Sequence, residues 1–361
     1  MHFLARPMLK PAMVLKLRAC LVLSLLAALG IASRGAPLPI KVVVVTTFEE
    51  ETGPQASGVS PGEGRAWIRG LHLDHVVPLP AGFHPVRLDD HGVLEIMTGM
   101  ATARATASIM ALGLDPRFDL SRAYWLLAGI AGVDPQRASL ASAAWAEWVV
   151  DGDITSFVDP REIPANWPDG RIPWDAASPF DPPGADIGQL YHLNPRLVHW
   201  AFELTRHTPI PDSEGMRRYR ARFTGFPAAQ RPPFVLMGDN LASATYWQGT
   251  LAAQAARRWV ALYTRNQGTF TTTSCEDAGF MQALTFLGRA GRVDLQRVMI
   301  LRTVSDYCAP PPGMSSVESL QYGPGKAYLA MRESFQSAYL VGSVVVRELA
   351  DHWDRYRDAA P

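Results

Sequence analysis

Two acidic residues, Glu276 and Asp306, are the leading candidates for catalysis and substrate binding in this sequence. Glu276 comes directly before an apolar run with helical spacing, and Asp306 follows the predicted strand 298–304 as part of a Ser-Asp pair. In an open α/β sheet, ligands bind beyond the carboxyl ends of the strands. Both acids are therefore expected at one crevice. Two carboxylates in one cleft can protonate a leaving group and hold a polar substrate.

The elements that must position these acids alternate between strands and helices. The sequence predicts buried strands at 40–46, 94–98, 124–127, 144–151, 234–237 and 298–304. It predicts helices at 104–112, 195–207, 250–265 and 325–350. This alternation indicates an α/β protein with a mostly parallel sheet and helices on both faces.

Residues 155–235 interrupt this pattern, because they hold many prolines and several tryptophans and few periodic runs. A structureless loop of that length is unusual inside a compact domain. We therefore expect an insert in a single domain spanning 37–361. It would pack over the cleft as a lid or serve as an interface.

The first 36 residues form a separate segment. Four basic residues precede an uncharged, Leu- and Ala-rich run at 19–33. This is typical of a secretory signal peptide, with cleavage expected between residues 32 and 36. An uncleaved anchor is the alternative, although the run is short for a membrane span. The sequence thus predicts a periplasmic or secreted protein with no stable membrane span after cleavage.

Composition narrows the function classes. The chain has 361 residues, 48% of them hydrophobic, and equal numbers of basic and acidic residues, 34 each. A nucleic-acid-binding protein would carry a basic footprint, so no nucleic-acid partner is expected. The nine histidines show no ligand spacing, so no metal site is expected. Cys275 and Cys308 could form a disulfide in an oxidising compartment or remain two buried thiols.

Short motifs at the strand ends occur in an order that resembles the nucleoside phosphorylase and nucleosidase superfamily. In chain order they are Phe48-Glu49-Glu50-Glu51, Thr98-Gly99-Met100, Ala128-Gly129-Ile130-Ala131-Gly132, Gly238-Asp239, Glu276-Asp277-Ala278-Gly279 and Arg302-Thr303-Val304-Ser305-Asp306. The last two are the most specific. The resemblance implies a three-layer, phosphorylase-like α/β fold with a mostly parallel mixed sheet.

Features of the insert and of the segment that follows it narrow the resemblance to one branch. The run Asp159-Pro160-Arg161-Glu162-Ile163-Pro164, Trp167, and Gly238-Asp239-Asn240 followed by Tyr246-Trp247-Gln248-Gly249 resemble the purine nucleoside permease family. The family's name implies nucleoside transport, whereas the fold implied by the resemblance is that of nucleoside-cleaving enzymes.

The resemblance also implies roles for individual residues. Asp306 matches the acid that protonates the departing purine, and Glu276 matches the carboxylate that accepts hydrogen bonds from the ribose hydroxyls. Glu51, or alternatively Glu49, matches the base that activates water. Further substrate contacts are expected from Ser305, Gly99, Met100, Ala131, Gly132, Asp239, Asn240, Tyr246 and Cys275.

Each of these three acids also has a purely structural alternative role. Asp306 could cap a helix, and Glu276 could interact only with a helix dipole. Glu51 could be a solvated loop charge. As functions, we expect a purine nucleoside hydrolase or phosphorylase without a cofactor. Phosphate would be the co-substrate if backbone N–H groups at Gly99 and Gly129 form an anion site.

The alternative is a nucleoside-binding component of an uptake system that does not turn over and has a membrane transporter as partner. A storage or structural protein on the same scaffold is a third interpretation. The resemblance also implies a homo-oligomer.

Overall fold

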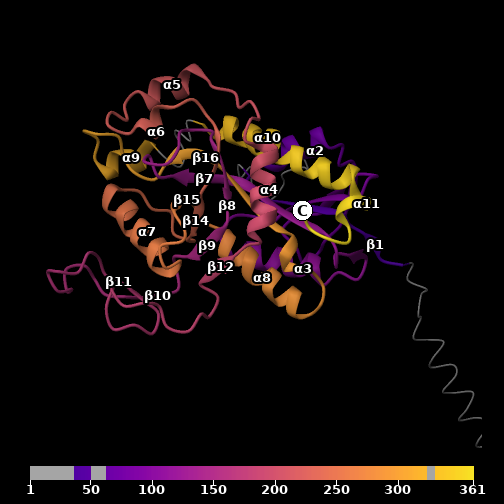
Figure 1. Ribbon diagram of the computed structural model, residues 1–361, viewed down its shortest axis with the longest axis horizontal. Helices are drawn as coiled ribbons and strands as arrows, with labels where there is room; N and C mark the ends of the chain where they lie inside the picture. The colour runs from indigo at the N-terminus through magenta and orange to yellow at the C-terminus, as the bar shows by residue number, and fades with distance from the viewer. Residues whose placement is uncertain (1–35, 50–61, 323–329) are drawn as a thin grey trace, which may run out of the picture. The chain divides into compact units, whose positions relative to one another are not determined.

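The computed structural model describes residues 36–49, 62–322 and 330–361 (Figure 1). A compact unit spans Pro39–Pro361, and the short strand β1 (Leu38–Pro39) stands at its start. The predicted signal segment lies almost entirely outside the described residues, as does Glu51. No helix in the described ranges is long and apolar enough to cross a membrane.

A large mixed sheet of 12 strands is organised around the long strand β7 (Tyr124–Val133). On one edge of β7, β2 (Val42–Thr46) pairs in parallel with its first half and β15 (Phe270–Ser274) pairs antiparallel near its end. On its other edge, β16 (Val298–Tyr307) runs parallel along the strand. The sheet therefore branches at β7.

The remaining strands extend these branches. Beyond β2 lie β5 (Val93–Met97), β4 (Val86–Leu88) and β3 (His75–Val77). Beyond β15 lie β14 (Asp239–Ala242), β9 (Trp148–Asp151) and β12 (Leu190–His192). Beyond β16 lie β8 (Ala143–Ala146) and β13 (Val235–Met237).

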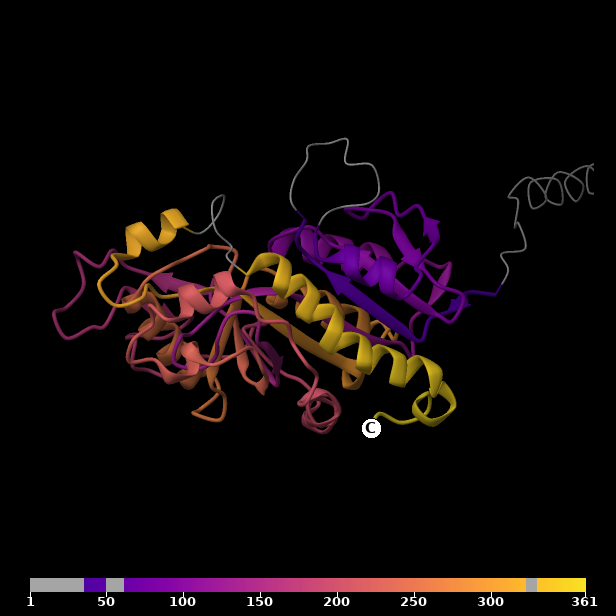
Figure 2. The same ribbon diagram turned by 90° about the horizontal axis from the view of Figure 1, so that it is seen from above.

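Two helix layers cover the central strands, one on each face of the sheet. Adjacent side chains of β7 point to opposite faces and therefore contact different layers. Trp125 packs on Phe280 of α8 (Asp277–Arg289), with ring centroids 6.4 Å apart. Leu126 lies instead against Gly342 of α10 (Met331–Asp351), which also contacts Trp67. Figure 2 shows α10 along one face of the sheet. The predicted three-layer α/β fold is thus confirmed.

Further helices complete each layer. On the α8 face, α3 (Thr102–Gly113) packs directly on α8. A Cβ atom on Gly279 would lie only 2.3 Å from the carbonyl oxygen of Thr102, so this close approach requires glycine. On the other face, α10 packs with α2 (Gly64–Gly70) and α4 (Pro195–Thr205). The longer helix α7 (Thr250–Tyr263) precedes β15, and the short elements are β6 (Phe118–Asp119), η1 (Leu295–Arg297), α9 (Ser316–Tyr322) and α11 (Trp353–Tyr356).

The insert at 155–235 belongs to the same body. It contributes β10 (Thr155–Phe157), β11 (Arg171–Pro173), β12, α4, α5 (Glu214–Arg220) and α6 (Pro227–Gln230). β12 returns to the main sheet and pairs antiparallel with β9, and α4 packs on β8 and β13. Through β12 and α4 the insert therefore joins the sheet and one helix layer, whereas β10 and β11 pair only with each other in a separate two-stranded sheet.

Several predicted boundaries differ from the structure. The predicted strand 124–127 continues to Val133 as β7. The predicted strand 144–151 is two strands, β8 and β9, which pair with different neighbours. The Asp239 carboxylate accepts from the backbone N–H groups of Glu147 and Trp148 at this break, at 3.2 and 2.8 Å. The chain also passes from β13 almost directly into β14, so Asp239 and Asn240, which the prediction leaves outside any strand, lie in a second strand.

Candidate functional site

A cavity of about 200 Å³ opens where β2, β7 and β16 end beside the first turn of α8. The loop 243–247 before α7 forms another part of its wall. Of the predicted site residues, those that line it are Met100, Ala131, Gly132, Tyr246, Cys275, Glu276, Ser305 and Asp306. The structure therefore brings the two principal acids, Glu276 and Asp306, to one small-molecule-sized site.

Asp306 reaches the cavity because β16 is irregular at this point. The register with β7 shifts between Val304 and Asp306, and such a bulge re-aims a side chain. The Asp306 carboxylate accepts from the Ser305 hydroxyl at 2.7 Å and from the Tyr246 hydroxyl at 3.0 Å. Burial raises its pKa, while both hydroxyl donors oppose that rise. Asp306 is thus suited to hold and deliver a proton.

Glu276 is the residue before α8, with 4% of its surface exposed. Its side chain makes no capping hydrogen bond to its own helix. Instead, Oε1 accepts from the Ala101 backbone N–H at 3.2 Å, and Oε2 accepts from Arg302 at 2.9 Å. The carboxylate is therefore held at the cavity wall by groups from other elements. The dipole interpretation alone does not account for this arrangement.

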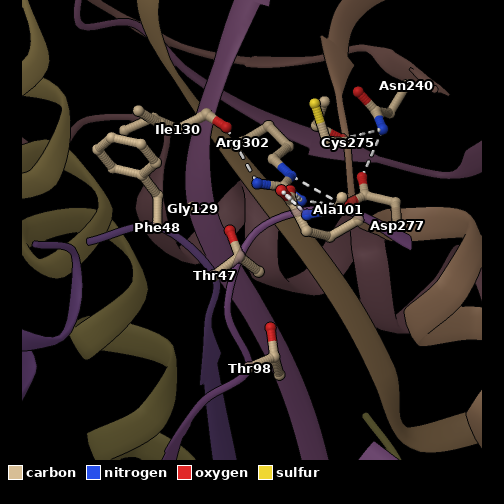
Figure 3. A network of polar contacts seen from close by, with 12 residues as sticks. Thr47, Phe48, Thr98, Ala101, Gly129, Ile130, Asn240, Cys275, Asp277 and Arg302 are labelled. Carbon is tan, nitrogen blue, oxygen red and sulfur yellow. Dashed lines mark hydrogen bonds and ion pairs between the residues drawn. The ribbon is translucent and has the colours of Figure 1, made fainter. Parts of the chain in front are cut away.

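Arg302 is the centre of a buried ionic network behind the cavity (Figure 3). Its guanidinium donates to Glu276, to Asp277 Oδ1 and to the Ile130 carbonyl. Burial opposes its charge, but the neighbouring carboxylates outweigh that effect and raise its pKa. Buried charges persist only when paired in this way. Arg302 therefore fixes Glu276 in position.

Asp239 and Asn240 lie behind the cavity wall and are absent from its described lining. The Asn240 amide donates to Asp277 Oδ2 at 2.5 Å and to the Ser274 hydroxyl at 2.8 Å. Asp239 accepts backbone N–H groups from the β8–β9 break and from Thr269. The structure thus makes them framework residues, in contrast to the predicted substrate contacts.

Gly99 is also absent from the described lining. Its φ of +78° places it in the left-handed region, where glycine is favoured. It forms the turn that leads from β5 towards α3, and its neighbour Met100 lines the cavity.

Glu63 is an acid that the sequence analysis missed. It is fully buried, precedes α2, and accepts backbone N–H groups from Thr47, Phe48 and Ile130. Its only local signal is the Gly62-Glu63-Gly64 triplet before a short helix. Its partners are far away in the sequence, so the triplet alone does not indicate them.

The two cysteines of the compact unit both line the cavity as free thiols. Burial raises the pKa of Cys275 to about 12 and raises that of Cys308 as well. Both are therefore uncharged near neutral pH. Across the described ranges, the structure groups no three His, Cys, Asp or Glu side chains that could hold a metal ion.

The insert does not cover this cavity. No residue of 155–235 belongs to its described lining, so the expectation of a lid over the cleft is not met. The reason is topological, because β12 and α4 of the insert are engaged with the sheet and the α10 layer.

Residues 39–361 match the family model described as purine nucleoside permease. The chain belongs to the purine nucleoside permease family. A purine nucleoside permease of Candida albicans is 28% identical over 337 residues, which cover 90% of this chain and 79% of that protein. A probable purine nucleoside permease of Schizosaccharomyces pombe is 30% identical over 272 residues, 72% of this chain and 76% of that protein.

Solved structures place this member of the purine nucleoside permease family among nucleosidase folds. The futalosine hydrolase of Helicobacter pylori superposes with a TM-score of 0.53 at 12% identity, covering 86% of this chain and 98% of that one. The 5′-methylthioadenosine/S-adenosylhomocysteine nucleosidase of the same organism gives 0.51 at 11% identity, covering 85% and 98%. These likenesses concern the fold.

Proposed function

We propose that this protein binds a purine nucleoside in the cavity and cleaves its N-glycosidic bond. One observation carries the proposal: Glu276 and Asp306 line the same cavity, Glu276 paired with a buried arginine and Asp306 partly buried, with its pKa raised by desolvation. The names of the curated relatives support a purine nucleoside as ligand, and the nucleosidase folds support cleavage.

The chemistry divides between the two acids. Breaking the bond from the sugar to the base builds positive charge on the ribose and negative charge on the purine. Asp306 protonates a purine ring nitrogen, which makes the base a better leaving group. Each Glu276 oxygen already accepts one hydrogen bond and keeps capacity for a ribose hydroxyl. Its negative charge also favours the cationic sugar of the transition state.

Binding without turnover is the second candidate, because the matching family is described as a permease. In that case the cavity would deliver a nucleoside to a membrane transporter. Glu276 would keep its contacts with ribose, but Asp306 would not transfer its proton, because no base departs.

Export is a further part of the proposal, supported by the basic residues and apolar run within the first 36 residues. Expression with and without residues 1–36, followed by cell fractionation, tests it. Periplasmic or secreted protein is expected only from the longer form. Self-association, which we also propose, is tested by sedimentation of the shorter form.

The cleavage assay incubates the mature protein with inosine, guanosine or adenosine and separates free base by chromatography. We expect base release that Asp306→Asn abolishes. Asp354→Asn is the matched control, because its side chain is 93% exposed. Saturable nucleoside binding without release would favour the carrier function, and neither binding nor release would contradict both candidates.

A further inference from the structure

Glu63 fills a cradle of backbone N–H groups formed by the residues just after β2 and by Ile130 in the second half of the neighbouring strand β7. One carboxylate oxygen accepts from Thr47 N at 2.6 Å and from Phe48 N at 3.0 Å, and the other accepts from Ile130 N at 2.6 Å. The Thr47 hydroxyl adds a fourth donor at 3.2 Å. Four donors thus converge on one carboxylate with no exposed surface.

This cradle has the properties of an anion site. Convergent backbone N–H groups bind the oxygens of phosphate, sulfate or carboxylate. Burial raises the pKa of Glu63, while Arg302 and the three backbone donors oppose that rise. Both carboxylate oxygens face N–H donors, and the ionised carboxylate can accept a hydrogen bond from each of these donors. A Cβ atom on Gly129 would lie 2.9 Å from Glu63 Oε1, so this space also depends on glycine.

The cradle adjoins the candidate site. Thr47, Phe48 and Ile130 all line the cavity, whereas Glu63 itself lies behind them. Figure 3 shows these three residues near the Arg302 guanidinium. An anion in the place of the Glu63 carboxylate would therefore sit next to a nucleoside in the cavity.

The charges around the cavity disfavour a second anion. Arg302 already pairs with Glu276 and Asp277 and also feels the charge of Glu63. Three carboxylates thus surround one buried cation. In the part of the chain that the structure describes, no lysine or arginine lines the cavity. A phosphate ion entering the cavity would meet net negative charge.

We propose that Glu63 is a specificity-determining residue: its carboxylate occupies the position that an anionic acceptor would need, so that water and not inorganic phosphate is the acceptor. This inference rests on the proposed cleavage of a nucleoside. In the step, the water oxygen bonds to C1′ while the bond from C1′ to the purine nitrogen breaks. The electron pair goes to the purine, which takes a proton from Asp306. The water loses a proton to solvent, from which Asp306 is reprotonated, and the products are ribose and free purine.

The binding test compares the wild type with Glu63→Ala by calorimetric titration of inorganic phosphate at constant ionic strength. The wild type is expected to show no phosphate binding. Glu63→Ala exposes the N–H cradle, and we expect saturable phosphate binding together with a rise in Tm, because a ligand that binds only the folded state stabilises it. Glu95→Gln is the matched control, since Glu95 is buried nearby but accepts from the Thr46 hydroxyl and from none of the cradle N–H groups. It should not bind phosphate.

The product test uses the wild type alone, so it does not depend on the folding of a variant. Base release at an unchanged rate with and without phosphate, and ribose as the sugar product, support the inference. Ribose 1-phosphate as product would overturn it, as would phosphate binding by the wild type, or a folded Glu63→Ala that binds no phosphate. If Glu63→Ala does not fold, the phosphate titration and the sugar product of the wild type still decide whether the inference holds.

Failure of the proposed function is distinguishable from failure of this inference. A wild type that releases no base from any nucleoside contradicts cleavage. The phosphate titrations of wild type and Glu63→Ala would still support or overturn the blocked anion site.

Discussion

The buried Arg302 guanidinium donates to Glu276 at 2.9 Å and thereby joins β16 to the start of α8. The same guanidinium donates to Asp277, whose other oxygen accepts from the Asn240 amide. One cation therefore holds the ribose-binding acid of the proposed mechanism and ties three elements of the sheet and helix layer together.

Removal of this cation should be costly. Arg302→Ala leaves Glu276 and Asp277 as buried charges without their partner, so we expect a loss of about 3–5 kcal/mol in the free energy of unfolding. Arg122→Ala is the control, because Arg122 pairs with Asp358 at an exposed site and should cost about 1 kcal/mol or less. Urea unfolding of both variants measures the difference. Similar losses would show that the buried network does not carry the expected energy.

Tyr246 should tune the acid of the site. Its hydroxyl donates to Asp306 Oδ2, which favours the ionised carboxylate. Tyr246→Phe removes that donor and should raise the pKa of Asp306 further, since a hydrogen bond to the charged form favours that form. The alkaline limb of kcat/KM, where Asp306 loses its proton, should move to higher pH. Tyr191→Phe, whose hydroxyl contacts Gly188 and Gln282, should leave the limb in place. A limb that moves to lower pH in Tyr246→Phe contradicts this role.

Glu95 should make the fold less stable at alkaline pH. Burial raises its pKa from 4.5 to about 7 in the folded protein, although the Thr46 hydroxyl opposes the rise. Between these two pH values the folded state binds more protons than the unfolded state, so stability falls as pH increases. The loss is complete above the folded-state pKa and is on the order of 3 kcal/mol.

Glu95→Gln cannot titrate and keeps an acceptor for Thr46. Urea unfolding at pH 5 and pH 8 should therefore show a smaller decline in stability for this variant than for the wild type. Glu203→Gln, at a site where 55% of the side chain is exposed, should follow the wild type. An equal decline in Glu95→Gln would exclude Glu95 as the source.

The sequence was sufficient for the framework and for the two principal acids. Runs of apolar and β-branched residues are long enough to specify buried strands such as β2 and β16. The Ser305-Asp306 pair then marks the end of the second of these runs. Because the carboxyl ends of these strands converge, Glu276 and Asp306 could be expected at one site without coordinates.

The long-range contacts of the residues around the two acids could not be predicted from the sequence. Asp239 and Asn240 follow a predicted strand and were expected to contact substrate, but their roles depend on the break between β8 and β9 and on Asp277, which are distant in the chain. Glu63 likewise meets Ile130 across 67 residues. Such contacts join segments that only the folded sheet brings together, and no local pattern of residue types specifies them.

Replacing Glu276 and replacing Asp306 should impair different steps of the proposed reaction. Glu276→Gln removes the charged acceptor for the ribose hydroxyls, so we expect at least tenfold weaker nucleoside binding, consistent with about 1.5 kcal/mol or more for a hydrogen bond to a charged group. Its affinity for free purine should change little. Asp306→Asn should instead bind nucleoside within a few-fold of the wild type and slow base release by about 10²–10⁴-fold, the usual contribution of a general acid. Calorimetry with a nucleoside and with the matching purine, alongside single-turnover assays, separates these effects. Equal loss of nucleoside and purine affinity in Glu276→Gln would place that residue away from the sugar, because a ribose contact cannot alter binding of the free base.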